Sequence, residues 1–114
     1  MDDDRVVRGL IAEILRRAGH DVVAAAEADE ALLLAADSTI ELVITDMTMP
    51  GMSGIDLVRA LHADRPDLPV LIVTGSGADD TVAEALASGA AGVVGKPFSH
   101  AELRQAVAEA LADI

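Results

Sequence analysis

The sequence has 114 residues, 52% of them hydrophobic, no cysteine and a formal net charge of −12. Its length suits one domain with a single core. The absence of cysteine excludes disulfides and thiolate metal sites. The acidic charge disfavours nucleic acid as a direct partner, because phosphates would be repelled. No apolar run approaches the ~18 residues of a membrane span, and the start MDDDR lacks the basic and apolar segments of a secretory signal, so we expect a cytoplasmic protein of one domain, residues 1–114.

The N-terminal third predicts a helix, a strand and a second helix. Apolar residues recur at helical spacing over residues 6–15, and Gly19 is a suitable stop. The run DVVAAA at residues 21–26 predicts a short strand. Residues 29–36 predict the second helix, with Asp29 as its N-cap.

The middle of the chain predicts a buried strand and a capped helix. The run ELVITD, residues 41–46, is a strand that stops at a carboxylate, and a Pro-Gly turn follows. Ser53 is the predicted N-cap of the next helix, which contains Leu57, Val58 and Leu61. That helix must end before Pro66, because the residue before a proline avoids helical geometry.

The C-terminal third predicts two more strands, each followed by a helix. The β-branched run PVLIVTG, residues 69–75, is the clearest strand, and a helix from Asp79 or Asp80 to about Ser88 follows it. The last strand is AGVVG at residues 91–95. Ser99 and Glu102 form a capping-box pattern for the final helix, whose inward residues should be Leu103, Val107 and Leu111.

This alternation indicates an α/β domain, a doubly wound parallel sheet covered by helices on both faces. Ligands of such sheets bind beyond the carboxyl ends of the strands. Asp46, Thr74 and Lys96 lie at or just after three of these ends. One acid, one hydroxyl and the only lysine of the sequence should therefore meet at one edge.

The acidic start of the chain belongs at the same edge. Asp2, Asp3 and Asp4 directly precede the first helix, which in this architecture normally follows a strand. Carboxylates brought close together repel one another. A hard divalent cation removes that conflict, and Mg²⁺ prefers oxygen ligands such as one or two carboxylates, water and a phosphate.

The same residues suit phosphoryl chemistry. The carboxylate of Asp46 can act as a nucleophile, since carboxylates form acyl phosphates in enzymes. Lys96 can contact the phosphoryl group as a compact point charge, and the Thr74 hydroxyl can hydrogen-bond one of its oxygens. Each feature alone is more often a turn, a cap or a surface residue, but their combination at four element ends favours a functional site.

The chain resembles the receiver domain of two-component response regulators, which also occurs alone in the bacterial chemotaxis regulator. The resemblance covers residues 1–114 and is most specific in TDMTMPGMSG around Asp46. Weaker motifs accompany it in series: the acidic pair Asp2-Asp3, VTG with Thr74, and GKPF with Lys96.

The resemblance implies that a sensor histidine kinase or a phosphotransfer protein passes a phosphoryl group to Asp46, and that the domain then signals to a downstream protein. It implies Mg²⁺ held by Asp3, Asp46 and the backbone carbonyl of Thr48, with Asp2 acting through water. It implies a flavodoxin-like sheet of strand order 2-1-3-4-5 and a cis bond before Pro97. The domain would assist its own phosphorylation and dephosphorylation without being an enzyme for a separate substrate.

Two departures from the family pattern affect signalling. Val93 stands where the family often has an aromatic residue that turns inward, so we expect the signal to travel by backbone motion of residues 74–80. Thr48 and Ser76 occupy the positions that flank the attacking water in the family. Both are small and neutral, so we expect a phosphoryl group that persists for many minutes.

A third departure concerns the first strand. A receiver normally opens with an apolar strand before the acidic pair, whereas this sequence has Met1 where that strand would end. We expect residues 22–26 and 42–46 to pair directly in a four-stranded sheet, or to borrow an edge from another copy. Metal placement at Asp2 and Asp3 should then be weaker.

Three other functions fit less well. A receiver-like interaction domain that takes no phosphate is the main alternative, and the intact Asp46, Thr74 and Lys96 disfavour it. A nucleotide-binding loop in TGSGADD would have Asp80 in place of its third glycine. A carboxylate-nucleophile phosphatase would need an acid at Thr48. His20, His62 and His100 lack metal-ligand spacing, and we expect all three on the surface.

Overall fold

The three-dimensional structure is a computed structural model, which describes residues 5–20, 28–36, 39–47, 53–75, 79–95 and 98–112. The helices are α1 Arg5–Arg17, α2 Ala28–Ala35, α3 Gly54–Asp64, α4 Asp79–Ala87 and α5 His100–Ala112. The strands are β1 Val43–Asp46, β2 Val70–Thr74 and β3 Gly92–Gly95. Within the described part of the chain, no helix is both long and apolar enough to cross a membrane.

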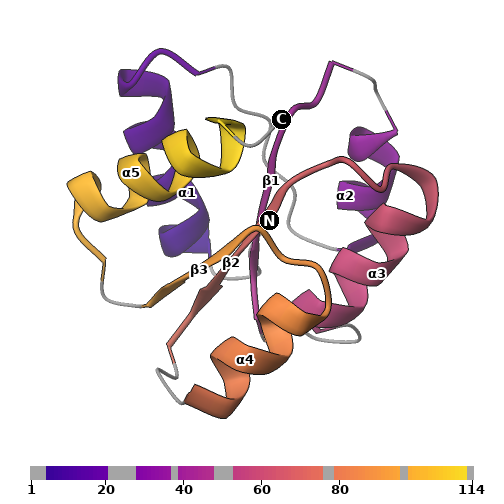
Figure 1. The fold of residues 1–114 in the computed structure, drawn as a ribbon. Coiled ribbons are helices and arrows are strands. Elements are labelled where there is room, and N and C mark those ends of the chain that lie inside the picture. Colours follow the sequence, from indigo (N-terminus) through magenta and orange to yellow (C-terminus); the bar gives the residue numbers. More distant parts are fainter. Residues whose placement is uncertain are drawn as a thin grey trace.

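The three strands form one parallel sheet in the order β1-β2-β3, with helices on both faces (Figure 1). This confirms the predicted α/β class. The order agrees with the last three positions of the expected 2-1-3-4-5 arrangement. The predicted strand at residues 21–26 and the acidic start lie outside the described residues, and with them the expected pairing of residues 22–26 with 42–46.

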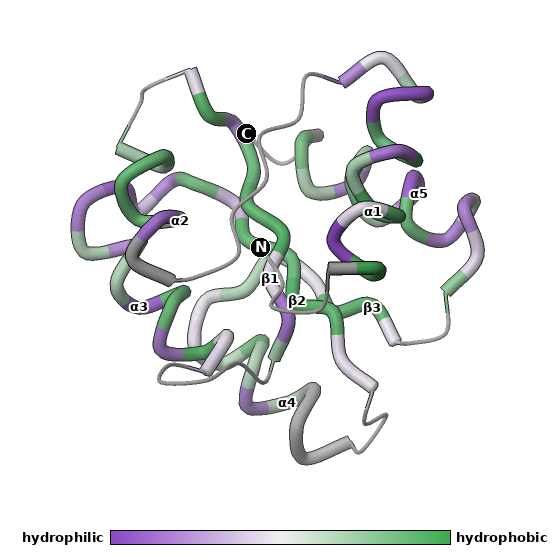
Figure 2. The backbone as a smooth tube through the Cα atoms, turned by 180° about the vertical axis from the view of Figure 1, so that it is seen from behind, coloured by the Kyte–Doolittle hydropathy of each residue, from purple (hydrophilic) through white to green (hydrophobic). Residues whose placement is uncertain are grey.

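The central strand β2 divides the core into two clusters. All five of its residues are buried, and they alternate between the faces because successive strand residues point to opposite sides. Val70 and Ile72 pack with α3 and α4, whereas Leu71 and Val73 pack with α1 and α5. In Figure 2 the apolar strands run through the middle, and the helices alternate between apolar and polar segments.

Helices on both faces contribute fully buried side chains to these clusters. Leu57 and Val58 of α3 are 0% exposed on one face, and Leu103 of α5 is 0% exposed on the other. Burying a side chain of this size stabilises the fold by about 1.5–3 kcal/mol. Leu103 and Val107 are buried as predicted, and Leu111 packs against the same cluster while partly exposed.

The predicted helix signals act as expected at three ends. Gly19 follows α1 with a φ of 96°, a left-handed conformation that favours glycine. Ser53 caps α3, since its Oγ accepts a hydrogen bond from the Asp56 N–H at 3.1 Å. Ser99 likewise accepts from the Glu102 N–H at 3.0 Å, which forms one half of the predicted capping box.

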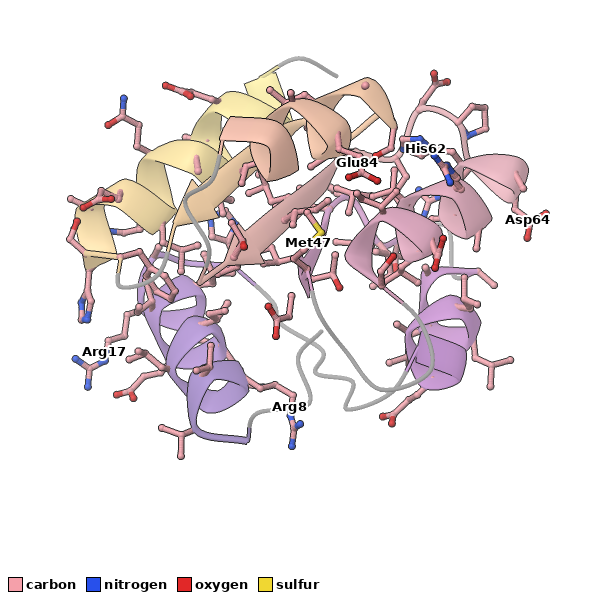
Figure 3. The ribbon with its side chains drawn as sticks, turned by 90° about the horizontal axis from the view of Figure 1, so that it is seen from below. Arg8, Arg17, Met47, His62, Asp64 and Glu84 are labelled. Carbon is pink, nitrogen blue, oxygen red and sulfur yellow. The ribbon has the colours of Figure 1, made fainter. Side chains whose placement is uncertain are left out.

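Two sequence predictions are wrong. α2 already includes Ala28, so Asp29 lies inside the helix rather than at its N-cap; alanine readily extends a helix by one residue. His62 is not a plain surface residue, because its Nε2 lies 2.8 Å from the carbonyl oxygen of Leu68 and it is half-buried. Figure 3 shows His62 turned inward from α3. His20 and His100 are exposed, as expected.

Candidate functional site

β1 carries Asp46 to the carboxyl edge of the sheet, where β2 ends beside it. Asp46 pairs with Val73 in the parallel register, so Thr74 is one residue further along the neighbouring strand. Adjacent strands are about 4.8 Å apart. Asp46 is half-buried, and Thr74 is only 3% exposed. The structure therefore brings together the predicted acid and the predicted hydroxyl.

The end of β3 completes the same edge. Gly95 is level with Thr74 in the register between β2 and β3, and Lys96 is the next residue in the chain. Lys96 itself lies outside the described residues, as do Asp2, Asp3 and Thr48. The structure describes no geometry for these four residues.

The backbone directly after Asp46 is held on two sides. The Met47 N–H donates to the Val73 carbonyl at 3.0 Å, which extends the sheet by one residue. The Met47 carbonyl accepts from the Gly54 N–H at 2.7 Å. The chain thus leaves the sheet at Met47 and returns to the same residue at Gly54, so the segment between them begins and ends at one point.

Gly54 is in close contact with the Asp46 backbone, which the sequence analysis missed. A Cβ on Gly54 would lie 2.6 Å from the Asp46 carbonyl oxygen and 3.0 Å from the Met47 Cα. Only glycine permits this approach. The available signal was a glycine at the first helical position after a good N-cap, Ser53, where capping itself does not require glycine.

Thr45 is the second missed residue. It is 0% exposed, and its Oγ1 donates to the Asp46 carbonyl oxygen at 3.1 Å. The available signal was a hydroxyl residue in the otherwise apolar run LVIT. A buried hydroxyl normally has a hydrogen-bond partner, and here that partner belongs to the candidate nucleophile.

The methionine of this segment packs into the core. Met47 is half-buried and packs against the core cluster on the α3 side of the sheet, which includes Leu57 and Ile72 (the α3-side cluster). Figure 3 shows its sulfur in the interior. Its side chain therefore contributes to the core on the α3 face of the sheet. Met49 and Met52 lie outside the described residues.

The described residues hold one of the expected metal ligands, Asp46. Among them no group of three or more acidic or histidine side chains gathers around one point. The expected donors are carboxylates and a backbone carbonyl, and such oxygen donors suit Mg²⁺. The Met47 carbonyl accepts a hydrogen bond from Gly54, and Thr48, whose carbonyl is the expected donor, lies outside the described residues.

Comparisons with known proteins agree with this architecture. The sequence profile of the response regulator receiver domain matches residues 1–108. The chain is 40% identical over 108 residues to the response regulator protein FleR of Pseudomonas aeruginosa, covering 95% of this chain and 23% of that protein. It is 38% identical over 112 residues to the chemotaxis protein CheY of the same organism, covering 94% and 89%.

A solved structure is similar over nearly the whole chain. The receiver domain of NtrX from Brucella abortus superposes with a TM-score of 0.93 at 32% identity, covering 99% of this chain and 96% of that one. The flavodoxin-like assignment is confirmed by this class of neighbours. Several relatives are much longer, and the chain spans about a quarter of their length.

Proposed function

The chain belongs to the response regulator receiver domain family, and from this premise we propose that Asp46 accepts a phosphoryl group from a phosphohistidine in a Mg²⁺-dependent reaction. A carboxylate oxygen of Asp46 attacks the phosphorus, the P–N bond breaks, and its electron pair remains on the imidazole nitrogen. The product is an acyl phosphate on Asp46.

One observation carries this proposal: Asp46 ends β1 next to the buried Thr74 of β2. A nucleophile on a strand end has a fixed position, and fixed positions lower the barrier to group transfer. The neighbouring hydroxyl of Thr74 would donate a hydrogen bond to an oxygen of the transferred group. Lys96, directly after the end of β3, would offset the negative charge of that group.

The metal would be held by oxygen ligands from three parts of the chain. These are the carboxylates of Asp3 and Asp46 and the backbone carbonyl of Thr48, with Asp2 acting through a water molecule. Mg²⁺, when bound, would offset the charge of the carboxylates and the phosphoryl oxygens. The protein's part is to keep Asp46 at a fixed position at the end of β1.

The partners follow from this chemistry. The phosphoryl donor would be a sensor histidine kinase or a phosphotransfer protein, and the recipient of the signal a downstream protein. We place the reaction in the cytoplasm, and we assign the domain no separate substrate to turn over.

Labelling with acetyl phosphate tests the proposal. Intact mass and gel mobility should show one phosphoryl group on the wild-type protein with Mg²⁺ and none with excess EDTA. Asp46→Asn should abolish labelling, because the amide is a poor nucleophile. Asp56→Asn is the matched control, since Asp56 is exposed on α3 and should label like the wild type.

Equal labelling of Asp46→Asn and the wild type would refute the assignment of Asp46. A folded wild-type protein that takes no label with Mg²⁺ would instead support the alternative, a receiver-like domain that signals by contact alone.

A further inference from the structure

The peptide group that joins Asp46 to Met47 has contacts on both its N–H and its carbonyl oxygen. Its N–H belongs to Met47 and donates to the Val73 carbonyl at 3.0 Å. Its carbonyl oxygen belongs to Asp46, accepts from Thr45 Oγ1 at 3.1 Å, and would lie 2.6 Å from a Cβ on Gly54. Hydrogen bonds at both polar atoms therefore restrain the orientation of this peptide group.

The direction of the Asp46 carbonyl matters because it is set by ψ, the torsion about the Cα–C bond of Asp46. A rotation about the Cα–C bond turns the peptide relative to the Cα–Cβ bond of the same residue. It therefore changes where the carboxylate lies relative to the following backbone. The Thr45 hydroxyl opposes the rotation by its hydrogen bond. Gly54 opposes any displacement of the oxygen by van der Waals contact.

We propose that Thr45 and Gly54 are positioning residues of the phosphoacceptor, which fix the Asp46–Met47 peptide and thereby the direction of the Asp46 carboxylate at the end of β1. This inference rests on the proposed function of Asp46. Neither residue touches the reacting atoms; both act through the backbone of Asp46.

The competing explanation is that both residues only stabilise the fold. Thr45→Val separates the two explanations, because valine has nearly the same shape, suits a buried strand and lacks the hydroxyl. A purely structural role predicts unchanged labelling wherever the variant is folded. A positioning role predicts slower labelling that needs a higher Mg²⁺ concentration, without a matching loss of stability.

The experiment measures the initial rate of labelling by acetyl phosphate over a range of Mg²⁺ concentrations. We expect Thr45→Val to lower the rate about fivefold at limiting Mg²⁺, which corresponds to the ~1 kcal/mol of one buried hydrogen bond. Thr45→Ser keeps the hydroxyl and should restore most of the rate. We expect Gly54→Ala to lower the rate about 10- to 100-fold, the loss typical of a misplaced reacting group.

Two control variants remove the structural explanation. Gly9→Ala is the matched glycine control, because Gly9 also lies in a helix but an added Cβ there meets nothing within 4 Å. Val107→Ala lowers stability in the α1- and α5-side cluster, where Val107 is 1% exposed. Both should label at the wild-type rate below their melting temperatures.

The outcomes separate the two proposals. If the wild type is labelled, Asp46→Asn is not, and Thr45→Val matches the wild type at every Mg²⁺ concentration, the positioning role is wrong while the function of Asp46 stands. If the wild type takes no label, the proposed function itself has failed. Should Gly54→Ala fail to fold, as circular dichroism would show, the comparison of Thr45→Val with Thr45→Ser decides alone.

Discussion

The carboxyl ends of β1 and β2 lie side by side, yet the backbone beyond them is packed in opposite ways. Beyond β1, an added Cβ at Gly54 would lie 2.6 Å from a backbone oxygen. Beyond β2, Gly75 is exposed, and an added Cβ would meet nothing within 4 Å. Gly54 permits a close backbone contact, whereas Gly75 has room for a Cβ atom.

This difference separates two tasks of one site. The candidate nucleophile needs a fixed position, and its strand end is fixed. Under the proposed function the hydroxyl of Thr74 responds to the new group, and an added Cβ at the next residue, Gly75, would meet nothing within 4 Å. We infer that the signal leaves the site through the end of β2 rather than through β1.

The surroundings of Val93 also favour a signal that leaves through the end of β2. It is half-buried and packs against the α3-side cluster together with Ile72 and Ala85. A valine in that place has no ring to move in or out, and the sequence contains no tyrosine. Val93 cannot make the rotamer change of the family's aromatic residue, so we expect the response to be backbone motion after Thr74.

The largest expected contrast is in stability. Gly54→Ala forces the α3 N-terminus away from the Asp46 backbone and should lower the free energy of unfolding by about 1–3 kcal/mol, the usual cost of overpacking. Gly75→Ala should change it by less than about 0.5 kcal/mol, as expected of an exposed site. Urea denaturation of both variants measures the difference. Equal losses would show that the two strand ends are packed alike.

A smaller effect should be seen in the response to phosphorylation. Backbone amide shifts on labelling should be large over residues 75–80 and small at Val93. Thr74→Val should still be labelled at Asp46 but show reduced shifts over residues 75–80, because the hydroxyl that follows the phosphoryl group is gone. Val107→Ala serves as the control for general destabilisation. Large shifts at Val93 with small ones at residues 75–80 would contradict this route.

The sequence predicted elements well where the signal is local. Ser53, Gly19 and the run at residues 69–75 each specify structure within a few residues, and all three predictions are confirmed. The failure at Asp29 is a one-residue shift of a helix end, whereas the failure at His62 involves a partner distant in sequence. His62 contacts the Leu68 carbonyl and lies beside Gly89, where an added Cβ would be 3.0 Å from its ring nitrogen. The hydrophobic periodicity of the sequence gives no information about such a contact.

The candidate site shows the same limit. Asp46 and Thr74 could be placed at one edge because parallel strands align their carboxyl ends. The contacts of Thr45 and Gly54 with the Asp46 carbonyl could not be predicted, because they depend on where α3 begins relative to β1. A motif identifies the reacting group, whereas packing determines what holds it.

The smallest expected effect concerns hydrolysis of the acyl phosphate. Thr48 follows Asp46 by two residues and Ser76 follows Thr74 by two, which are the positions expected from the receiver family to flank the attacking water. Neither side chain has a carboxylate or amide to orient that water.

We expect the label on purified protein to persist for many minutes without a phosphatase. We expect Thr48→Gln to shorten the lifetime of the label only modestly, since a fixed β1 end does not by itself place the longer side chain correctly. Decay of the label followed by intact mass, with Asp56→Asn as the matched control, measures both lifetimes. Loss of the wild-type label within seconds would mean that another group orients the water, and the open end of β2 would be the first place to look for it.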